Sequence, residues 1–249
     1  MKEKVIAISG GTSGIGLAVA RILVNQGARV ALAGRSNEKG MAALEELGAL
    51  ATFTSVDVRD EKSSFTWLDQ VFSAEGRLDG LVNSAGIYWE GTIGSVTFEI
   101  YQNVMDTNLK GTFFLSQKAL AIMDSQGGGQ IVNVASDAGI TGNLGCALYC
   151  ASKSGVVGLT KALALEGALA RVRVNAVCPA DVETPLWQAQ CALRPNPEEA
   201  AHEMGQAYPM GRIARPEEVA EVICFLLSSK SSFVNGAIWT VDGGITAGI

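Results

Sequence analysis

Tyr149 and Lys153 are the two side chains in this sequence with the clearest potential for proton chemistry. They stand four residues apart in a segment whose spacing predicts a helix, so both side chains share one helix face. A neighbouring cation stabilises a phenolate and lowers the phenol pKa from about 10 toward neutrality, which makes tyrosine a general acid or base. The pattern alone is common. Its position adds weight, because Ser136 lies thirteen residues earlier at the end of a predicted buried strand, where open α/β sheets bind ligands.

A glycine-rich turn near the N-terminus has the composition of a phosphate-binding loop. It joins an apolar strand pattern to a helical one and reads Ser9-Gly10-Gly11-Thr12-Ser13-Gly14-Ile15-Gly16. Glycines let the backbone turn sharply and approach a pyrophosphate, and the start of a helix offers free N–H groups and a positive dipole end. The placement between strand and helix predicts a dinucleotide site, although a tight turn without a ligand would look the same.

The end of the second predicted strand bears on which dinucleotide binds. A dinucleotide fold usually places an acid about 20 residues after the turn, to hold the adenosine ribose. Here the strand ends Ala33-Gly34-Arg35-Ser36, without an acid. Gly34 leaves room, and Arg35 can pair with a 2′-phosphate in a bidentate manner. We therefore favour NADP(H). NAD(H), with an arginine that is solvated or stacked on adenine, is the alternative.

The elements that must position these residues alternate along the chain. Strands are predicted at 5–9, 29–33, 51–56, 78–83, 130–135, 171–177 and 237–241. Helices are predicted from residue 15 to a stop at Gly27, at 39–47 with a stop at Gly48, and at 60–74, 98–123 with a break near Gly111, 148–169 and 216–227. This order predicts an α/β fold, a single-domain Rossmann-type doubly wound parallel sheet of about seven strands with helices on both faces. One domain spans 1–249, with a substrate lid at about 181–212 that contains four of the six prolines.

Composition excludes several classes of protein. The chain has 249 residues, 48% hydrophobic and 18% charged, with a formal net charge of −6. These values exclude a disordered chain, and the acidic balance argues against a general nucleic-acid partner. Mean hydropathy is +0.23, yet no run of about 18 apolar residues could span a membrane. The five cysteines form no C-x-x-C pair, which predicts reduced thiols in a cytoplasmic protein.

Further motifs follow in order along the chain. They are Asp57-Val58 after the third strand, Asn83-Ser84-Ala85-Gly86 after the fourth, Asn108 in Asn-x-x-Gly, Pro179 to Thr184 after the sixth, and Val241-Asp242-Gly243-Gly244. With the glycine-rich turn and Ser136, Tyr149 and Lys153, they resemble the short-chain dehydrogenase/reductase family over essentially the whole chain. Ser84 and Ala180 depart from the family pattern, which has asparagine and glycine there. The alanine adds a methyl group near the expected nicotinamide site.

The resemblance implies an oxidoreductase that moves a hydride between a nicotinamide cofactor and a secondary alcohol or ketone. Tyr149 would exchange a proton with the substrate oxygen, Lys153 would lower the tyrosine pKa and bond the nicotinamide ribose, and Ser136 would hold the substrate oxygen. Asn108 would maintain a water-linked proton route to Lys153, and no metal would be needed. The implied cofactor-binding residues are Gly10, Thr12, Ser13, Gly14, Ile15, Gly16, Arg35, Ser36, Asp57, Val58, Asn83, Ala85, Gly86, Tyr149, Lys153, Pro179, Val182 and Thr184. The family also implies a homotetramer.

Two alternatives stay open. A 3-oxoacyl-carrier-protein reductase would need basic residues near the mouth of the site, and the candidates are Arg171, Arg173 and Arg212. A non-catalytic dinucleotide-binding sensor is the alternative from another class, and the complete set of catalytic residues argues against it. Candidates for the substrate pocket are Tyr88, Trp89, Asn143, Trp187, Met204 and Tyr208, whereas His202 is expected at the surface.

Overall fold

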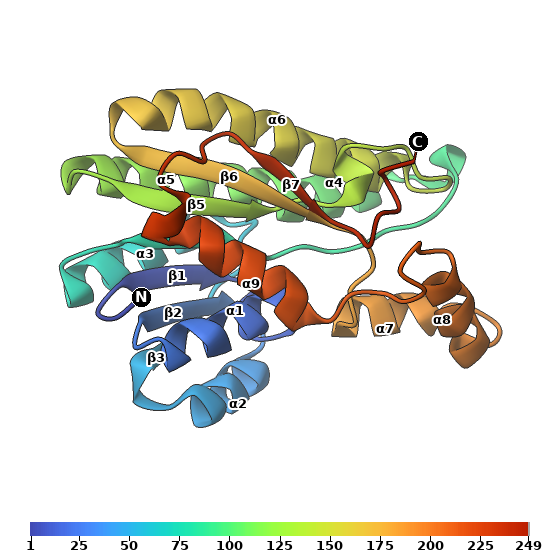
Figure 1. Cartoon of the computed structure of the whole chain (residues 1–249), viewed down its shortest axis with the longest axis horizontal. Helices are drawn as coiled ribbons and strands as arrows, with labels where there is room; N and C mark the ends of the chain where they lie inside the picture. The colour runs from blue at the N-terminus through green and yellow to red at the C-terminus, as the bar shows by residue number, and fades with distance from the viewer. Residues whose placement is uncertain (249) are drawn as a thin grey trace.

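The computed structural model describes residues 1–248, which form one seven-stranded parallel sheet (Figure 1). The strands are β1 (Val5–Ser9), β2 (Arg29–Gly34), β3 (Ala51–Ser55), β4 (Gly80–Asn83), β5 (Gly129–Val134), β6 (Val172–Pro179) and β7 (Ile238–Val241). Their order is β3-β2-β1-β4-β5-β6-β7, with every pair parallel. The predicted doubly wound sheet is confirmed. The chain winds outward in one direction from β1 and in the other from β4, so the switch point lies between these two strands.

Helices cover both faces of the sheet. On one face lie α1 (Gly14–Asn25), α2 (Asn37–Leu47) and α9 (Pro216–Leu227), and on the other lie α3 (Glu61–Glu75), α4 (Phe98–Met105), α5 (Gly111–Ser125) and α6 (Ala147–Leu169) (Figure 1). Successive residues of a strand point to opposite faces. In β1, Ile6 and Ile8 therefore join the core beneath α1 and α9, while Val5 and Ala7 join the core beneath α3 and α5. Burial on both faces explains why the strands are apolar without alternation.

The predicted bounds agree with the structure to within two residues for the strands and for most helices. The first two helices end where glycine predicts, because Gly27 and Gly48 have φ of +78° and +71°, a conformation that costs glycine little. The predicted helix at 98–123 differs. It divides at a π-helical segment, Asp106–Lys110, just before Gly111. A π turn adds a residue to the helix and changes which side chains face inward, and here it buries Thr107 and Asn108.

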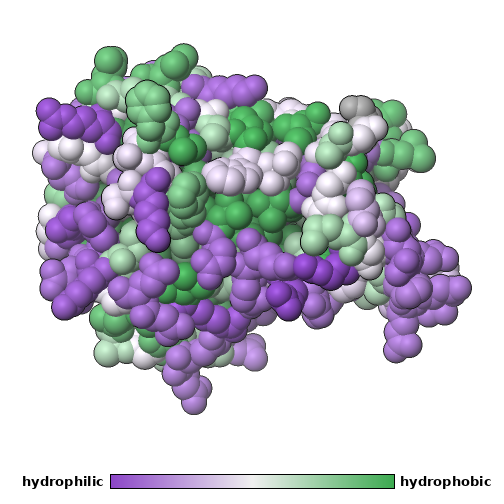
Figure 2. Space-filling model, in the orientation of Figure 1, coloured by the Kyte–Doolittle hydropathy of each residue, from purple (hydrophilic) through white to green (hydrophobic). Residues whose placement is uncertain are grey.

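The segment between β6 and α9 leaves the sheet and returns to the same point. Val182 pairs with Ala214 in an isolated bridge, and Ala214 N donates to Asp181 O over 3.0 Å. Between these ends the chain forms two short helices, α7 (Pro185–Cys191) and α8 (Pro197–Gln206), which project beyond the sheet (Figure 1). The surface over α8 is hydrophilic in Figure 2. No helix within residues 1–248 has the length and apolar character needed to cross a membrane.

Candidate active site

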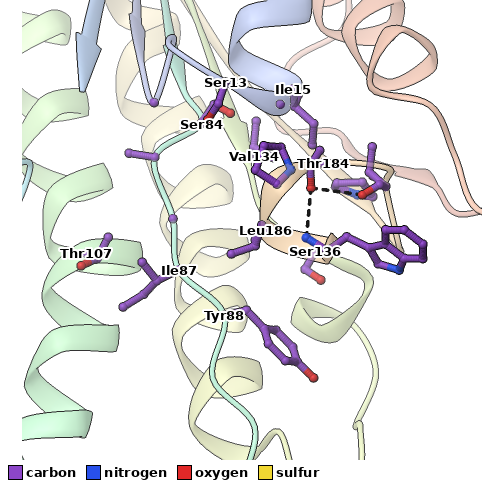
Figure 3. Close-up of a pocket in the computed structure, with 18 of the residues that line it drawn as sticks. Ser13, Ile15, Ser84, Ile87, Tyr88, Thr107, Val134, Ser136, Thr184 and Leu186 are labelled. Atoms are coloured by element: carbon purple, nitrogen blue, oxygen red, sulfur yellow. Dashed lines mark hydrogen bonds between the residues drawn. The ribbon is translucent and has the colours of Figure 1, made fainter. Parts of the chain in front are cut away.

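A cleft of about 860 Å³ lies along the carboxyl edge of the sheet, over the switch point between β1 and β4. Its walls come from the glycine-rich turn, the ends of β2 to β6, the start of α6 and the start of the lid. Sixteen of the eighteen predicted cofactor-binding residues line it, namely Gly10, Thr12, Ser13, Gly14, Ile15, Arg35, Ser36, Asp57, Val58, Ala85, Gly86, Tyr149, Lys153, Pro179, Val182 and Thr184. The catalytic candidate Ser136 lines it too. In Figure 3, Ser13 and Ile15 stand at one end and Tyr88 at the other.

Three predicted site residues lie behind the walls of the cleft. Gly16 allows the start of α1 to pack on the turn, because a Cβ there would lie 2.4 Å from the Gly10 carbonyl oxygen. Asn83 turns into the protein interior, where its Nδ2 donates to Ser116 Oγ and Asn133 Oδ1, both over 2.9 Å. Sequence spacing places residues at the end of a strand but does not determine which way each side chain turns.

Asn108 is the third of these residues. It is buried in the π-helical segment, and its side chain holds the loop after β4. Asn108 Oδ1 accepts from Ile87 N over 2.9 Å, and Nδ2 donates to Ile87 O and to Ser152 Oγ over 3.0 and 3.1 Å. These bonds connect α6 to the loop that carries Gly86. Asn108 therefore fixes the position of the tyrosine helix relative to the cleft wall.

Tyr149, Lys153 and Ser136 come together at one end of the cleft. Lys153 is 5% exposed; its Nζ lies 5.8 Å from the centroid of the Tyr149 ring and donates to the Val134 carbonyl oxygen over 2.9 Å. Ser136 begins a short 3₁₀ turn, Asp137–Gly139, at the end of β5. The arrangement can pass a proton between a phenol and a substrate oxygen, with a hydroxyl beside that oxygen.

The electrostatics of this group differ from the expectation that Lys153 lowers the pKa of Tyr149. Burial raises the pKa of Tyr149, while the Ser136 hydroxyl opposes the rise. Burial also lowers the pKa of Lys153 to about 8. The reason is that an enclosed site disfavours the charged form of both groups, and the lysine ammonium is turned to a backbone carbonyl rather than to the phenol oxygen.

The other end of the cleft suits a dinucleotide. Ser13 caps α1 without a side-chain hydrogen bond, so the N–H groups of the first turn stay available to an anion. The glycines of the turn also have a packing role. A Cβ at Gly10 would lie 2.7 Å from Ala85 N, and one at Gly14 would lie 3.0 Å from Thr184 Cγ2. The turn therefore brings the loops after β4 and β6 together around the cleft.

Positive charge gathers where β2 passes into α2. Arg35 is exposed and lines the cleft, and Lys39, which the sequence reasoning missed, lines it one helical turn later. Ser36 caps α2 by accepting from Lys39 N over 3.2 Å. The space expected beside Gly34 is partly taken by Thr12, whose Oγ1 would lie 2.9 Å from a Cβ at residue 34. The Asp57 carboxylate is held by Arg59, and this hydrogen bond keeps the pKa of Asp57 below its ordinary value.

The end of the cleft beside Tyr149 is formed by loops and by the segment 181–212, which the sequence predicts to be a lid. Of the pocket candidates, Tyr88, Asn143, Trp187 and Tyr208 line it, while Trp89 and Met204 do not, and His202 is exposed on α8. Residues missed from the sequence are Ile87, Thr107, Asp137, Asp181, Leu186, Gln190 and Ile245, several of which appear in Figure 3. Of these, Asp137 had a visible signal, since it directly follows Ser136.

Comparisons with known proteins agree over nearly the full length. Residues 10–246 match the family described as enoyl-(acyl carrier protein) reductase. The chain is 39% identical to 2-(S)-hydroxypropyl-CoM dehydrogenase 3 of Xanthobacter autotrophicus, over 99% of this chain and 98% of that protein. It is 38% identical to a 3-oxoacyl-(acyl-carrier-protein) reductase of Thermotoga maritima, over 98% of both chains. A solved variant of actinorhodin polyketide ketoreductase with NADPH superposes with a TM-score of 0.93, at 37% identity and 97% coverage of both chains.

These relatives are named as dehydrogenases and reductases, which supports an oxidoreductase over the non-catalytic alternative. The chain belongs to the short-chain dehydrogenase/reductase family and is a nicotinamide-dependent oxidoreductase that transfers a hydride between its cofactor and an alcohol or ketone.

Proposed function

We propose that Tyr149 is the general acid and base of this reaction and that Ser136, Lys153 and Asn108 support it. The observation that carries the proposal is the convergence of the phenol, the hydroxyl and the ammonium on one end of the cleft. The nicotinamide ring, when bound, supplies or accepts the hydride. The chain's own residues hold the substrate, exclude water and move the proton.

Each side chain has a distinct task in ketone reduction. Tyr149 donates its proton to the carbonyl oxygen, and its raised pKa keeps it protonated and ready to donate. Ser136 stabilises the same oxygen by hydrogen bonding. Lys153, with a pKa of about 8, is mostly protonated at neutral pH and can resupply the phenol. In alcohol oxidation the same groups accept the proton in reverse order.

Gly86 suits a proton route between Lys153 and Asn108. A Cβ at residue 86 would lie 3.5 Å from Lys153 Nζ and 3.4 Å from Asn108 Oδ1. Glycine therefore leaves the space between these two polar atoms open. Because buried waters bridge otherwise separate polar groups, we assign the space beside Gly86 to a water that connects Lys153 to the amide of Asn108.

NADP(H) is the cofactor that the charges favour. Arg35 and Lys39 line the adenosine end of the cleft, and neither is part of an ion pair within residues 1–248. A 2′-phosphate offers oxygens to both cations and to the Ser36 hydroxyl, whereas a ribose 2′-hydroxyl would leave the cations without a partner.

The substrate proposed is a small or cyclic secondary alcohol or its ketone. Of the arginines considered for docking an acidic carrier, Arg173 donates to the carbonyls of Leu226 and Ser228, and Arg212 pairs with Glu218 over 2.7 Å. Arg171 and Arg173 also stand at the start of β6, at the opposite edge of the sheet from the cleft. Arg173 and Arg212 are therefore engaged, and Arg171 lies away from the mouth of the cleft, so none of these three arginines supports the carrier-protein alternative.

A homotetramer in the cytoplasm is the proposed state. Leu165 and Leu169 on α6 are 78% and 93% exposed, and Trp239 is 40% exposed on β7, the edge strand. Apolar side chains are visible over this half of the molecule in Figure 2. Burial of such side chains between subunits is favourable. A monomer in sedimentation at micromolar concentration would contradict this assembly. The five cysteines stand as free thiols, which suits a reducing compartment.

Tyr149→Phe tests the proposed mechanism. Deleting only the hydroxyl should lower kcat by a factor of about 10² to 10⁴, the usual contribution of a general acid, while the Kd for the cofactor changes little. The matched control is Tyr101→Phe, since Tyr101 is 46% exposed on α4 and does not line the cleft. Near-normal turnover of Tyr149→Phe across a panel of ketones and alcohols would refute the assignment.

A further inference from the structure

The Ser136 hydroxyl is hydrogen-bonded to the residue that follows it. Ser136 Oγ donates to Asp137 Oδ1 over 2.8 Å and accepts from Ala138 N over 3.2 Å. Asp137 Oδ1 also accepts from Ala138 N over 2.7 Å, so the short turn fixes the carboxylate as well as the serine. Both Ser136 and Asp137 line the cleft. A serine has one proton, and here that proton points to a carboxylate.

The Asp137 carboxylate and the substrate oxygen therefore compete for the hydroxyl proton of Ser136. An ionised carboxylate is an acceptor only, so it keeps the Ser136 proton and presents the serine oxygen to the cleft as an acceptor. In reduction, the carbonyl oxygen gains negative charge and needs donors around it. Ser136 can donate to that oxygen only when its bond to Asp137 is released. A protonated Asp137 reverses the direction, because its own O–H can donate to Ser136 Oγ.

The surroundings of Asp137 favour the protonated form more than water does. Asp242 follows β7 and Asp181 follows β6, and both place negative charge near Asp137. The other titratable groups facing it are Cys178 on β6, Tyr149 and Cys146 at the start of α6, and Tyr208 of the lid. Lys153 is the one cation lining this end, since Arg35 and Lys39 line the adenosine end. Burial is the main cause that raises the pKa of Asp137, and Asp242 adds to it.

We propose that Asp137 is a positioning residue that sets the direction of the Ser136 hydroxyl, holding it away from the substrate oxygen when ionised and releasing it toward that oxygen when protonated. The inference rests on the proposed role of Ser136. No covalent bond changes in the switch beyond protonation of Asp137 from solvent. The bond Ser136 O–H···Asp137 is replaced by Asp137 O–H···Ser136, and the serine proton turns to the substrate.

The test is the pH profile of ketone reduction in wild type and Asp137→Asn, from about pH 4, near the ordinary pKa of an aspartate, up to pH 9. An asparagine amide can donate to Ser136 Oγ at every pH, so the variant imitates the protonated state. Wild type should gain activity as the pH falls and Asp137 becomes protonated, and the activity of the variant should show no such rise. At pH 8 the variant should be about fivefold faster in kcat/KM, since charged and neutral hydrogen bonds differ by about 1 kcal/mol.

Three further variants make the result decisive. Asp181→Asn is the matched control, because Asp181 also lines the cleft with a raised pKa but does not bond Ser136. The inference would be overturned if Asp181→Asn lost the rise in activity at low pH, or if Asp137→Asn kept that rise. Asp137→Ser repeats the test with another donor if asparagine prevents folding, which cofactor binding reports. In a Ser136→Ala background Asp137→Asn should have no effect on the profile. Full activity of Ser136→Ala would instead refute the proposed role of the serine.

Discussion

Replacing Arg35 by serine removes one positive charge from the adenosine end of the cleft without disturbing a packed residue. Arg35 is exposed and follows β2, and Lys39 lines the same wall. A hydrogen bond to a charged group contributes about 1.5–3 kcal/mol, and exposure to solvent favours the lower end of this range. A loss of about 1.5 kcal/mol corresponds to a roughly tenfold weaker Kd for NADP(H). The Kd for NAD(H), which lacks the phosphate, should stay within about twofold.

The assay is a fluorescence titration of both reduced cofactors, supported by kcat/KM for each with the same ketone. Arg35→Asp should weaken NADP(H) further, because two unit charges about 4 Å apart in water repel by about 1 kcal/mol. The loss should shrink as salt is added, since exposed charges are screened within a Debye length of about 10 Å at 0.1 M. Lys39→Ser should produce a loss of similar size.

Arg29→Ser is the control for long-range charge. Arg29 starts the same strand at the opposite edge of the sheet, where it pairs with Glu75 over 2.8 Å, so it removes the same charge from a site far from the cleft. It should leave both Kd values unchanged. The reasoning is refuted if Arg35→Ser weakens NADP(H) and NAD(H) equally, or weakens neither. Either outcome would mean that the arginine does not contact the 2′-position.

Two further substitutions concern stability. Lys153→Met should raise the free energy of unfolding at pH 7 by about 3 kcal/mol. Burial lowers the pKa of Lys153 in the folded protein from the ordinary 10.5 to about 8, so at pH 7 the folded protein bears the cost of burying a charged ammonium, and methionine removes that cost. The stability difference between Lys153→Met and wild type should shrink as the pH rises from 8 to 10.5, because residue 153 of the wild type binds more protons in the unfolded chain than in the folded one over this range. The exposed control Lys161→Met should keep a constant difference from wild type in urea unfolding. Asn83→Ala should cost roughly 2–4 kcal/mol by leaving Ser116 and Asn133 without a donor, with cofactor Kd within about twofold. A large loss of cofactor affinity at unchanged stability would contradict the buried role of Asn83.

The sheet and the position of the cleft could be predicted because they depend on local patterns. Apolar runs bounded by glycines identify the strands, and parallel strands bring their carboxyl ends to one edge. Tyr149 and Lys153 share a helix face by spacing alone, and Ser136 ends a strand that the pattern places beside them. Motif order then predicts further residues at the ends of the strands, and most of these line the cleft.

The departures arise where a side chain's direction depends on tertiary contacts. Asn83 ends β4 as expected, yet it turns inward because Ser116 and Asn133 offer partners there. Asn108 reaches the loop after β4 only because a π turn rotates it inward, and no spacing rule predicts that turn. Lys39 reaches the cleft because α2 begins beside Arg35, two residues before the predicted start.

The substrate end was the least predictable region because its shape depends on contacts between segments distant in sequence. Glu90, in the loop after β4, binds Arg194 of the lid through both carboxylate oxygens, over 2.9 and 2.8 Å. The Tyr88 hydroxyl contacts Glu90 over 3.1 Å, and the Tyr88 ring packs edge-on against Tyr149 with centroids 5.1 Å apart. A chain of contacts therefore connects the lid to the proposed acid. Since the Glu90–Arg194 pair is exposed and such pairs contribute only about 0.2–1 kcal/mol, we expect Arg194→Ala to lower the free energy of unfolding by no more than about 1 kcal/mol.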